Sequence, residues 1–144
     1  MSKQPVMVFQ ITINPTEISE LEGPTGKVKM IPFSGTVDSP LFKGVIRPGA
    51  VDVQVTNAAG IRHMCARYFF DGTDTTGKPC HLFVDNNGYF EPDSSPSPFR
   101  TAPTFLTDSA ELAPYLHSAR FRTEGHPREG GVEIRVFDVL QEQE

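Results

Sequence analysis

Alternation of polar and apolar side chains is clearest at the middle of the chain, in residues 62–71 (RHMCARYFFD). Neighbouring side chains on a β-strand point to opposite faces, so a period of two sorts these residues into two sets. One set is polar and reactive and the other is largely apolar: His63, Cys65, Arg67 and Phe69 against Arg62, Met64, Ala66, Tyr68 and Phe70. A turn-forming run, GTDTTG, follows, and residues 80–87 are again extended, so the two stretches are predicted to pair as a hairpin.

The same kind of pattern recurs along the chain. Residues 51–56 (VDVQVT) alternate most regularly, with three valines on one side and Asp52, Gln54 and Thr56 on the other. Further strands are predicted at residues 6–14, 27–34, 36–38, 42–47, 99–106, 118–123 and 131–139, with residues 15–26 as a loop and 125–130 as a turn. Only residues 108–116 resemble a helix, with Asp108 or Ser109 as its N-cap and Pro114 keeping it short.

These elements predict an all-β fold of about eight to ten antiparallel strands, with one short helix near residues 108–116, in a single domain spanning residues 1–144. No strand–helix–strand alternation occurs, so a parallel sheet is disfavoured. A closed or nearly closed β-barrel is favoured over a sandwich because closure leaves no exposed edge. A barrel of about eight strands has room inside for side chains or for one small ligand.

The composition agrees with this class, because 11 Phe, 13 Pro and 12 Gly are typical of aromatic strands broken by turns. The net charge of −5, with 13 scattered Lys and Arg, argues against nucleic acid as a partner. The chain has no apolar run of about 18 residues and no start of signal-peptide type, so we expect no membrane partner and a cytoplasmic location. In that reducing compartment Cys65 and Cys80 are expected to be free thiols.

Candidate chemistry gathers on the polar face of the central strand. His63, Cys65 and Arg67 follow one another at roughly 6.5 to 7 Å and are candidates to bind one small molecule. Arg67 would favour a nucleophilic thiolate at Cys65, but the spacing gives no direct contact with a base, and a buried thiol is the simpler interpretation. No metal and no organic cofactor are predicted, because no glycine motif opens a helix and the histidines occur singly: His63, His81, His117 and His126.

The strand at residues 51–56 has two alternative orientations. With its valines toward the core, Asp52 and Gln54 are solvated, which is the ordinary arrangement for a sheet with one wet face. With the valines toward an outer layer or a neighbouring subunit, Asp52 and Gln54 point inward and can neutralise an inward Arg67, since an unpaired buried guanidinium is too costly. Arg67 and Arg100 are then candidates to bind an acidic or carbonyl ligand, the alternative being a polar network that only fills the barrel.

Ordered segments along nearly the whole chain resemble a bacterial family known as domain of unknown function 3237. The segments are residues 31–37 (IPFSGTV), 40–44 (PLFKG), 48–54 (PGAVDVQ), 66–68 (ARY), 71–72 (DG), 87–88 (NG), 99–105 (FRTAPTF) and 115–117 (YLH). The resemblance implies a small antiparallel β-barrel without a general activity, and it favours the inward orientation of Asp52 and Gln54. The chain departs from the family pattern at Cys65, where an acidic residue is common, and at His117, where Asn is usual.

Two functions of different classes remain. The first is a small-molecule site in the barrel, with or without catalysis of a cofactor-independent isomerisation, cyclisation or hydrolysis of an aromatic or carbonyl compound. In it Arg67 or Arg100 would bind an anion and His63 or His117 would act as acid or base, beside Asp52, Gln54 and Cys65. The second is a non-catalytic binding or assembly module with a filled polar interior. In either case apolar outward strand faces predict a homo-oligomer.

Overall fold

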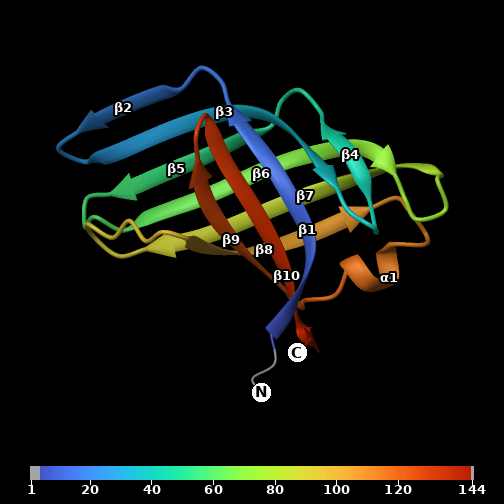
Figure 1. Ribbon diagram of the computed structural model, residues 1–144. Helices are drawn as coiled ribbons and strands as arrows, with labels where there is room; N and C mark the ends of the chain where they lie inside the picture. The colour runs from blue at the N-terminus through green and yellow to red at the C-terminus, as the bar shows by residue number, and fades with distance from the viewer. Residues whose placement is uncertain (1–3, 144) are drawn as a thin grey trace.

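The computed structural model describes residues 4–143, which form ten strands and one helix (Figure 1). In chain order the elements are β1 (Gln4–Pro15), β2 (Ser19–Gly23), β3 (Gly26–Asp38), β4 (Lys43–Ile46), β5 (Val51–Asn57), β6 (Arg62–Thr73), β7 (Pro79–Phe90), β8 (Phe99–Thr107), α1 (Ala113–Leu116), β9 (Phe121–Arg128) and β10 (Gly131–Gln143). The predicted all-β class with one short helix is confirmed.

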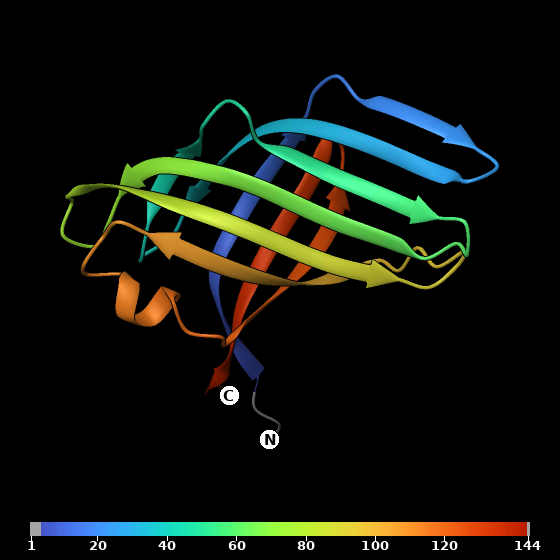
Figure 2. The ribbon, with the colours of Figure 1, turned by 180° about the vertical axis from the view of Figure 1, so that it is seen from behind.

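The strands form one antiparallel sheet that is closed by a ring of hydrogen bonds. The order runs β1-β10-β9-β8-β7-β6-β4-β3-β2, with β5 between β3 and β6, and β1 also pairs with β3. That last pairing joins the two ends of the sheet, so the fold is barrel-like. Figures 1 and 2 show β3, β5, β6, β7 and β8 side by side as one curved wall, crossed on the opposite side by β1, β9 and β10.

The interior between the two walls is filled mainly by aromatic and branched side chains. Phe9, Phe42, Phe70 and Phe121 are fully buried, and the rings of Phe42 and Phe70 meet edge to face with centroids 5.9 Å apart. Aromatic rings bury a large apolar area per residue, which suits a small barrel that has no disulfide to stabilise its core. The phenylalanine-rich composition is thus explained by the interior.

The central hairpin is confirmed, and its register fixes which face is inside. Strands β6 and β7 pair from Arg62–Phe90 to Thr73–Pro79. Met64, Tyr68 and Phe70 are buried, whereas Arg67 is 64% exposed. The expectation that Arg67 points into the barrel is therefore wrong. The physical reason is that the apolar face of this strand supplies the core, so the alternate residues face outward.

The helix is shorter than predicted, because it begins at Ala113 rather than at Asp108 or Ser109. Asp108 instead accepts hydrogen bonds from the backbone N–H of His81 at 2.7 Å and contacts the His81 ring at 2.6 Å. Ser109 donates to Asp74 at 3.0 Å and accepts from the N–H of Leu112. The two polar side chains thus tie the segment before the helix to the β6–β7 turn and to the start of β7.

Several strand boundaries differ from the predicted ones: residues 118–120, for example, precede β9, which begins at Phe121. Two differences are larger. Residues 19–23 were assigned to a loop but form β2, an exposed strand that pairs with the first part of β3. The turn expected at residues 125–130 is restricted to Glu129 and Gly130, because β9 continues through Arg128. Both errors have one cause: these strands carry few apolar residues and include Gly or Pro, so the alternation that marks a strand is absent.

Both cysteines are free thiols. Cys80 pairs across the hairpin with Gly72, whereas Cys65 lies opposite Asn87.

Among residues 4–143, no helix has the length and apolar character needed to cross a membrane.

Candidate functional site

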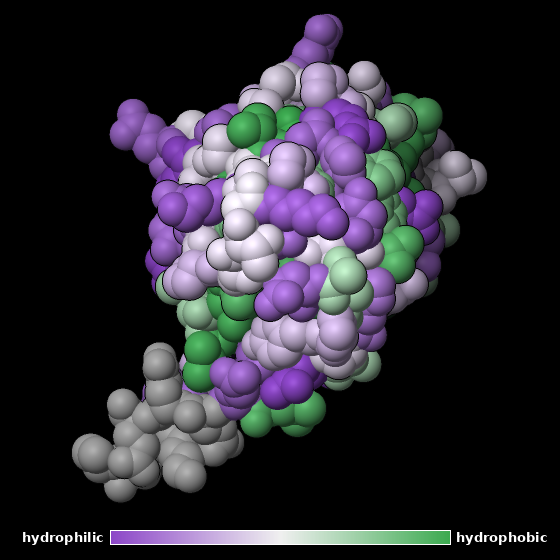
Figure 3. Space-filling model, turned by 90° about the vertical axis from the view of Figure 1, so that its right-hand side faces the viewer, coloured by the Kyte–Doolittle hydropathy of each residue, from purple (hydrophilic) through white to green (hydrophobic). Residues whose placement is uncertain are grey.

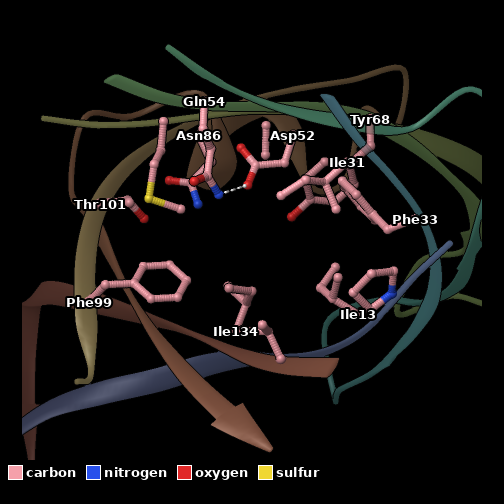
Figure 4. Close-up of a pocket in the computed structure, with 14 residues that line it drawn as sticks. Ile13, Ile31, Phe33, Asp52, Gln54, Tyr68, Asn86, Phe99, Thr101 and Ile134 are labelled. Atoms are coloured by element: carbon pink, nitrogen blue, oxygen red, sulfur yellow. Dashed lines mark hydrogen bonds between the residues drawn. The ribbon is translucent and has the colours of Figure 1, made fainter. Parts of the chain in front are cut away.

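A cavity of about 150 Å³ lies inside the barrel between its two walls and is partly open to solvent (Figure 4). Protein interiors are normally packed without such voids. A closed apolar cavity of about this volume holds a benzene ring, so this partly open one has room for a small aromatic frame that extends toward its mouth. The lining residues are mostly apolar: Ile13, Pro15, Ile31, Phe33, Asp52, Gln54, Met64, Ala66, Tyr68, Asn86, Phe99, Thr101, Val132 and Ile134. In Figure 4 the polar side chains gather on one side of the cavity, opposite Ile13, Phe99 and Ile134.

Asp52 is the centre of the polar wall. Gln54 Nε2 donates a hydrogen bond to Asp52 Oδ2 at 2.9 Å (Figure 4). Asp52 Oδ1 is buried and has no hydrogen-bond partner, and no other buried side-chain nitrogen or oxygen shares this condition within the described part of the chain. An unmet buried acceptor of this kind costs about 1–3 kcal/mol, so it is an uncommon feature of a folded protein.

The electrostatics of the site follow from burial. Burial raises the pKa of the Asp52 carboxyl above its ordinary value, and the Gln54 hydrogen bond and the positive charge of Arg62 oppose this only in part. Burial, followed by the negative charge of Asp52, also raises the pKa of the Tyr68 phenol, so this hydroxyl remains neutral. A carboxyl with a raised pKa holds protons more strongly than an ordinary aspartate, as a general base in a proton-transfer site must.

The VDVQVT strand builds this wall. Asp52 and Gln54 line the cavity, so the inward orientation is the correct one of the two alternatives. Val51, Val53 and Val55 consequently lie on the outer face of β5. This inverts the usual rule for a half-buried strand, and it makes Asp52 a candidate site residue.

A second polar group comes from β7 and was not identified from the sequence. Asn86 is only 6% exposed and lines the cavity beside Ala66. Thr123 donates to Asn86 Oδ1 at 3.4 Å, and the hydroxyls of Thr123 and Thr101 are hydrogen-bonded to each other. Asn and Gly in the run Asn86-Asn87-Gly88 are residue types typical of turns and bulges, so the local sequence does not mark Asn86 as an inward strand residue.

Three of the predicted site residues lie together on the outer surface of β6. His63 stacks on Tyr89 with ring centroids 4.3 Å apart, and its Nε2 is 2.8 Å from Asn87 Oδ1. Cys65 Sγ is 3.8 Å from Asp85 Oδ1, and Arg67 Nε is 3.6 Å from Asp85 Oδ2. Burial and the nearby Asp85 charge raise the pKa of Cys65, which is the opposite of an activated thiolate.

The two remaining predicted residues also lie outside the cavity lining. Arg100 is 71% exposed and pairs with Glu124, with Nη2 and Oε2 3.8 Å apart. His117 follows helix α1, and its Nε2 accepts a hydrogen bond from the N–H of Thr107 at 3.0 Å. Its ring therefore fastens the helix to the end of β8. Among the sequence-predicted site residues, the cavity brings together Asp52 and Gln54, and their role in binding stays a prediction.

Arg62 is an inward basic residue near the cavity. Its guanidinium lies over the Phe90 ring, 4.8 Å from the centroid, and its Nη2 donates to the carbonyl of Ser94 at 3.5 Å. The charge acts on Asp52 from a distance, since no hydrogen bond joins the two. Within the described residues, no three His, Cys, Asp or Glu side chains are grouped so that they could hold a metal ion.

Several solved structures share this architecture. A protein of unknown function from Clostridium acetobutylicum ATCC 824 is 26% identical, covers 95% of this chain and 97% of its own, and superposes with a TM-score of 0.75. A conserved protein of unknown function from Rhodopseudomonas palustris is 22% identical over 94% and 97% of the two chains, with a TM-score of 0.73. An enzyme from Penicillium herquei is 14% identical over 95% and 96%, with a TM-score of 0.64, which shows the shared fold alone.

No curated protein matches the chain in sequence. A family model described as a protein of unknown function (DUF3237) matches residues 1–139. This match covers the strands that build the cavity, including Asp52 and Asn86, and it confirms the resemblance found in the ordered sequence segments. The chain belongs to the DUF3237 family.

Proposed function

We propose that the protein binds a small, neutral and largely apolar molecule that carries a hydroxyl group in the barrel cavity, and that Asp52 transfers a proton at that group without an organic cofactor. The observation that carries the proposal is Asp52 Oδ1, a buried acceptor without a partner in a cavity with an otherwise mostly apolar lining. A ligand O–H aimed at this atom removes the cost of the unmet acceptor. The remaining lining then buries the apolar frame of the ligand.

The charge of the lining supports a neutral ligand. Asp52 is the one acidic residue among the lining residues, and none of them is Lys, Arg or His. An acidic ligand would place a second negative charge beside Asp52 without a positive partner in the lining. This differs from the sequence-based hypothesis of an anion bound by Arg67 or Arg100, because both guanidinium groups are mainly in solvent.

The residue types in the cavity favour isomerisation or cyclisation over hydrolysis. Its lining contains no Ser, Cys, Lys or His that could form a covalent intermediate. A carboxyl with a raised pKa suits the removal and return of one proton at a bound molecule. The Penicillium herquei enzyme has the same fold, so this architecture is compatible with catalysis.

The binding part of the proposal can be tested with a matched pair of ligands. 2-Naphthol carries a hydroxyl donor, whereas 2-methoxynaphthalene has the same rings without one. Isothermal titration calorimetry should show tighter binding of 2-naphthol to the wild-type protein. In the Asp52→Asn variant this preference should disappear, because Gln54 Nε2 keeps the Asn carbonyl and turns its NH₂ toward the ligand. Asp85→Asn is the control, since Asp85 lies on the outer face. Equal binding of both ligands to the wild-type protein would overturn the proposal.

A second function, homo-oligomeric assembly, is supported by the outer face of the sheet. Phe69, Phe83 and Leu106 lie in one row across β6, β7 and β8, and Leu106 is 62% exposed. On the side seen in Figure 3, by contrast, hydrophobic residues form separate areas between hydrophilic ones. We infer that the row is covered by a second copy of the chain. Light scattering should give a dimer or larger oligomer, and Leu106→Lys should dissociate it; a strictly monomeric wild-type protein would contradict this.

A further inference from the structure

We propose that the cavity takes an enolisable ketone on an apolar frame, and that Asn86 is its second catalytic residue, donating Nδ2–H to the enolate oxygen formed when Asp52 removes the α-hydrogen. This rests on Asp52 as the proton-transfer group of the proposed function. It adds a ketone substrate, in which Asp52 acts at the α-carbon and not at a hydroxyl, and an oxyanion donor. Three observations support it: the position of Asn86, the orientation of its amide and the absence of charge from the rest of the lining.

The position of Asn86 follows from strand register. Asp52 pairs with Ala66 across β5 and β6, and Ala66 pairs with Asn86 across β6 and β7. The three residues therefore form one row on the inner wall, with the backbones of Asp52 and Asn86 roughly 10 Å apart by ordinary strand spacing. The small Ala66 side chain leaves space between the two longer ones. A ketone lying over Ala66 can present its α-hydrogen to Asp52 and its oxygen to Asn86.

The orientation of the Asn86 amide is set by its neighbours on β8 and β9. Asn86 Oδ1 accepts from the hydroxyl of Thr123, whose own oxygen is paired with Thr101. The Asn86 Nδ2 group donates no hydrogen bond to any described residue, although the side chain is 6% exposed. An amide donor without a protein partner on a cavity wall lies in the same row as the Asp52 carboxyl. A ketone oxygen can accept from Asn86 Nδ2 while the α-hydrogen lies at Asp52, the group that removes it.

The reaction needs no oxidant or reductant. The α-C–H bond breaks and an O–H bond forms at Asp52 Oδ1. The C–H electron pair becomes the C=C bond of the enolate, and the π pair of the carbonyl moves to its oxygen, where Asn86 Nδ2–H stabilises the charge. Asp52 then returns the proton to the same carbon or, in an unsaturated ketone, to the conjugated one. The net result is exchange of the α-hydrogen or isomerisation.

The experiment uses 2-tetralone, an enolisable ketone on the two-ring frame of 2-naphthol. Proton NMR in D₂O follows the exchange of its α-hydrogens in the presence of wild-type protein and variants. The wild-type protein should accelerate exchange above a buffer of equal pH, and Asp52→Asn should remove the acceleration. Asn86→Ala should lower the exchange rate at saturating ketone by about 10²-fold or more, the effect of losing one oxyanion donor. The Asn86→Ala variant should still bind 2-methoxynaphthalene, which would show that its cavity is intact.

Two further variants make the result specific to Asn86. Asn87→Ala changes the same residue type one position along β7, on the outer face, and should leave the exchange rate unchanged. Asn86→Ser is a second substitution, which keeps a hydroxyl donor on a smaller side chain. Its exchange rate should lie between those of Asn86→Ala and the wild-type protein. It also tests the role of Asn86 if Asn86→Ala fails to fold. Unchanged exchange in both Asn86 variants would overturn the role of Asn86.

The two proposals fail in different ways. If the wild-type protein prefers 2-naphthol over 2-methoxynaphthalene but does not exchange 2-tetralone, binding at Asp52 stands and the enolisation inference is wrong. If it shows no preference for 2-naphthol, the proposed function itself is wrong, and exchange of 2-tetralone then requires another base. Exchange that survives Asp52→Asn also requires another base, and it would overturn the role of Asp52 in the enolisation.

Discussion

The amide nitrogen of Gln54 lies 2.9 Å from Asp52 Oδ2, and this contact satisfies one carboxylate oxygen while the other, Oδ1, remains buried without a partner. The two residues are separated by one position on β5, so they share the inner face of the barrel. Gln54 thereby fixes the rotation of the carboxylate of this cavity-lining residue. A side chain whose neighbour orients it in this way is pre-organised for a ligand.

The buried Asp52 should make stability fall as pH rises. Its pKa is raised in the folded protein, so between the ordinary carboxyl value of about 3.9 and the raised value the folded state binds more protons than the unfolded state. The contribution of Asp52 is therefore most favourable below this window and is lost as pH rises through it. In denaturant titrations at several pH values, Asp52→Asn should gain stability relative to wild type with rising pH. Asp38→Asn, at a side chain 83% exposed, controls for net charge; an equal trend in both variants would contradict the argument.

Asp138 should show the opposite pH dependence. It is fully buried and accepts hydrogen bonds from Tyr115 at 2.5 Å, from Arg120 at 3.0 Å and from two backbone N–H groups. Burial opposes its ionisation, but these hydrogen bonds outweigh burial and hold its pKa below the ordinary value. Asp138→Asn should cost about 3 kcal/mol at neutral pH, near the low end for a broken buried pair because Arg120 is partly exposed. The difference from wild type should shrink as pH falls below about 4.

The position of Arg67 gives a prediction that separates the observed structure from the sequence-based one. Arg67 is 64% exposed and makes one ion pair, with Asp85 at 3.6 Å. Exposed pairs of this kind contribute less than about 1 kcal/mol. Arg67→Met should therefore leave the free energy of unfolding within that margin and the affinity for 2-naphthol unchanged. A loss of several kcal/mol in chemical denaturation, or a loss of ligand binding, would place the guanidinium inside the barrel after all.

Strand alternation predicts two faces well but does not say which one is inside. For β6 the more reactive set, with His63 and Cys65, suggested an interior site, whereas Met64 and Tyr68 supply the core. For β5 the alternation alone left both orientations open, and the family resemblance favoured the inward Asp52 that the structure shows. The choice between faces depends on ring closure between β1 and β3, a contact between distant parts of the chain that no local pattern encodes.

The position of the cavity was equally outside the reach of local patterns. Asn86 belongs to the site because three strands align Asp52, Ala66 and Asn86 in one row, and register of that kind is a property of the assembled sheet. Phe99 belongs to it because its ring lies over a glycine of the neighbouring strand. The class of fold, by contrast, follows from the density of alternating strands and turns, which are local.

Phe99 and Gly125 lie against each other beside the cavity, and they give the last prediction. The two residues are paired across β8 and β9, and Phe99 lines the cavity. A Cβ atom added at Gly125 would overlap three carbons of the Phe99 ring. In Gly125→Ala the Phe99 ring has to move away from residue 125. Because Phe99 lines the cavity, we expect the ring to move into the cavity. We expect the affinity for 2-naphthol to fall at least tenfold, and stability to fall by about 1–3 kcal/mol, as for other overpacked interiors. Calorimetry and thermal melts measure the two effects.

A second substitution distinguishes displacement of the ring from general damage to the barrel. In the double variant Gly125→Ala with Phe99→Leu, the smaller side chain no longer overlaps the new methyl group, so both affinity and stability should recover in large part. Gly23→Ala is the control glycine, because its added Cβ meets no atom within 4 Å, and it should change neither quantity. If the double variant binds 2-naphthol no better than Gly125→Ala alone, the Phe99 ring does not limit the cavity. The loss would then come from distortion of β9, where Gly125 also pairs with Ile134 of the neighbouring strand β10.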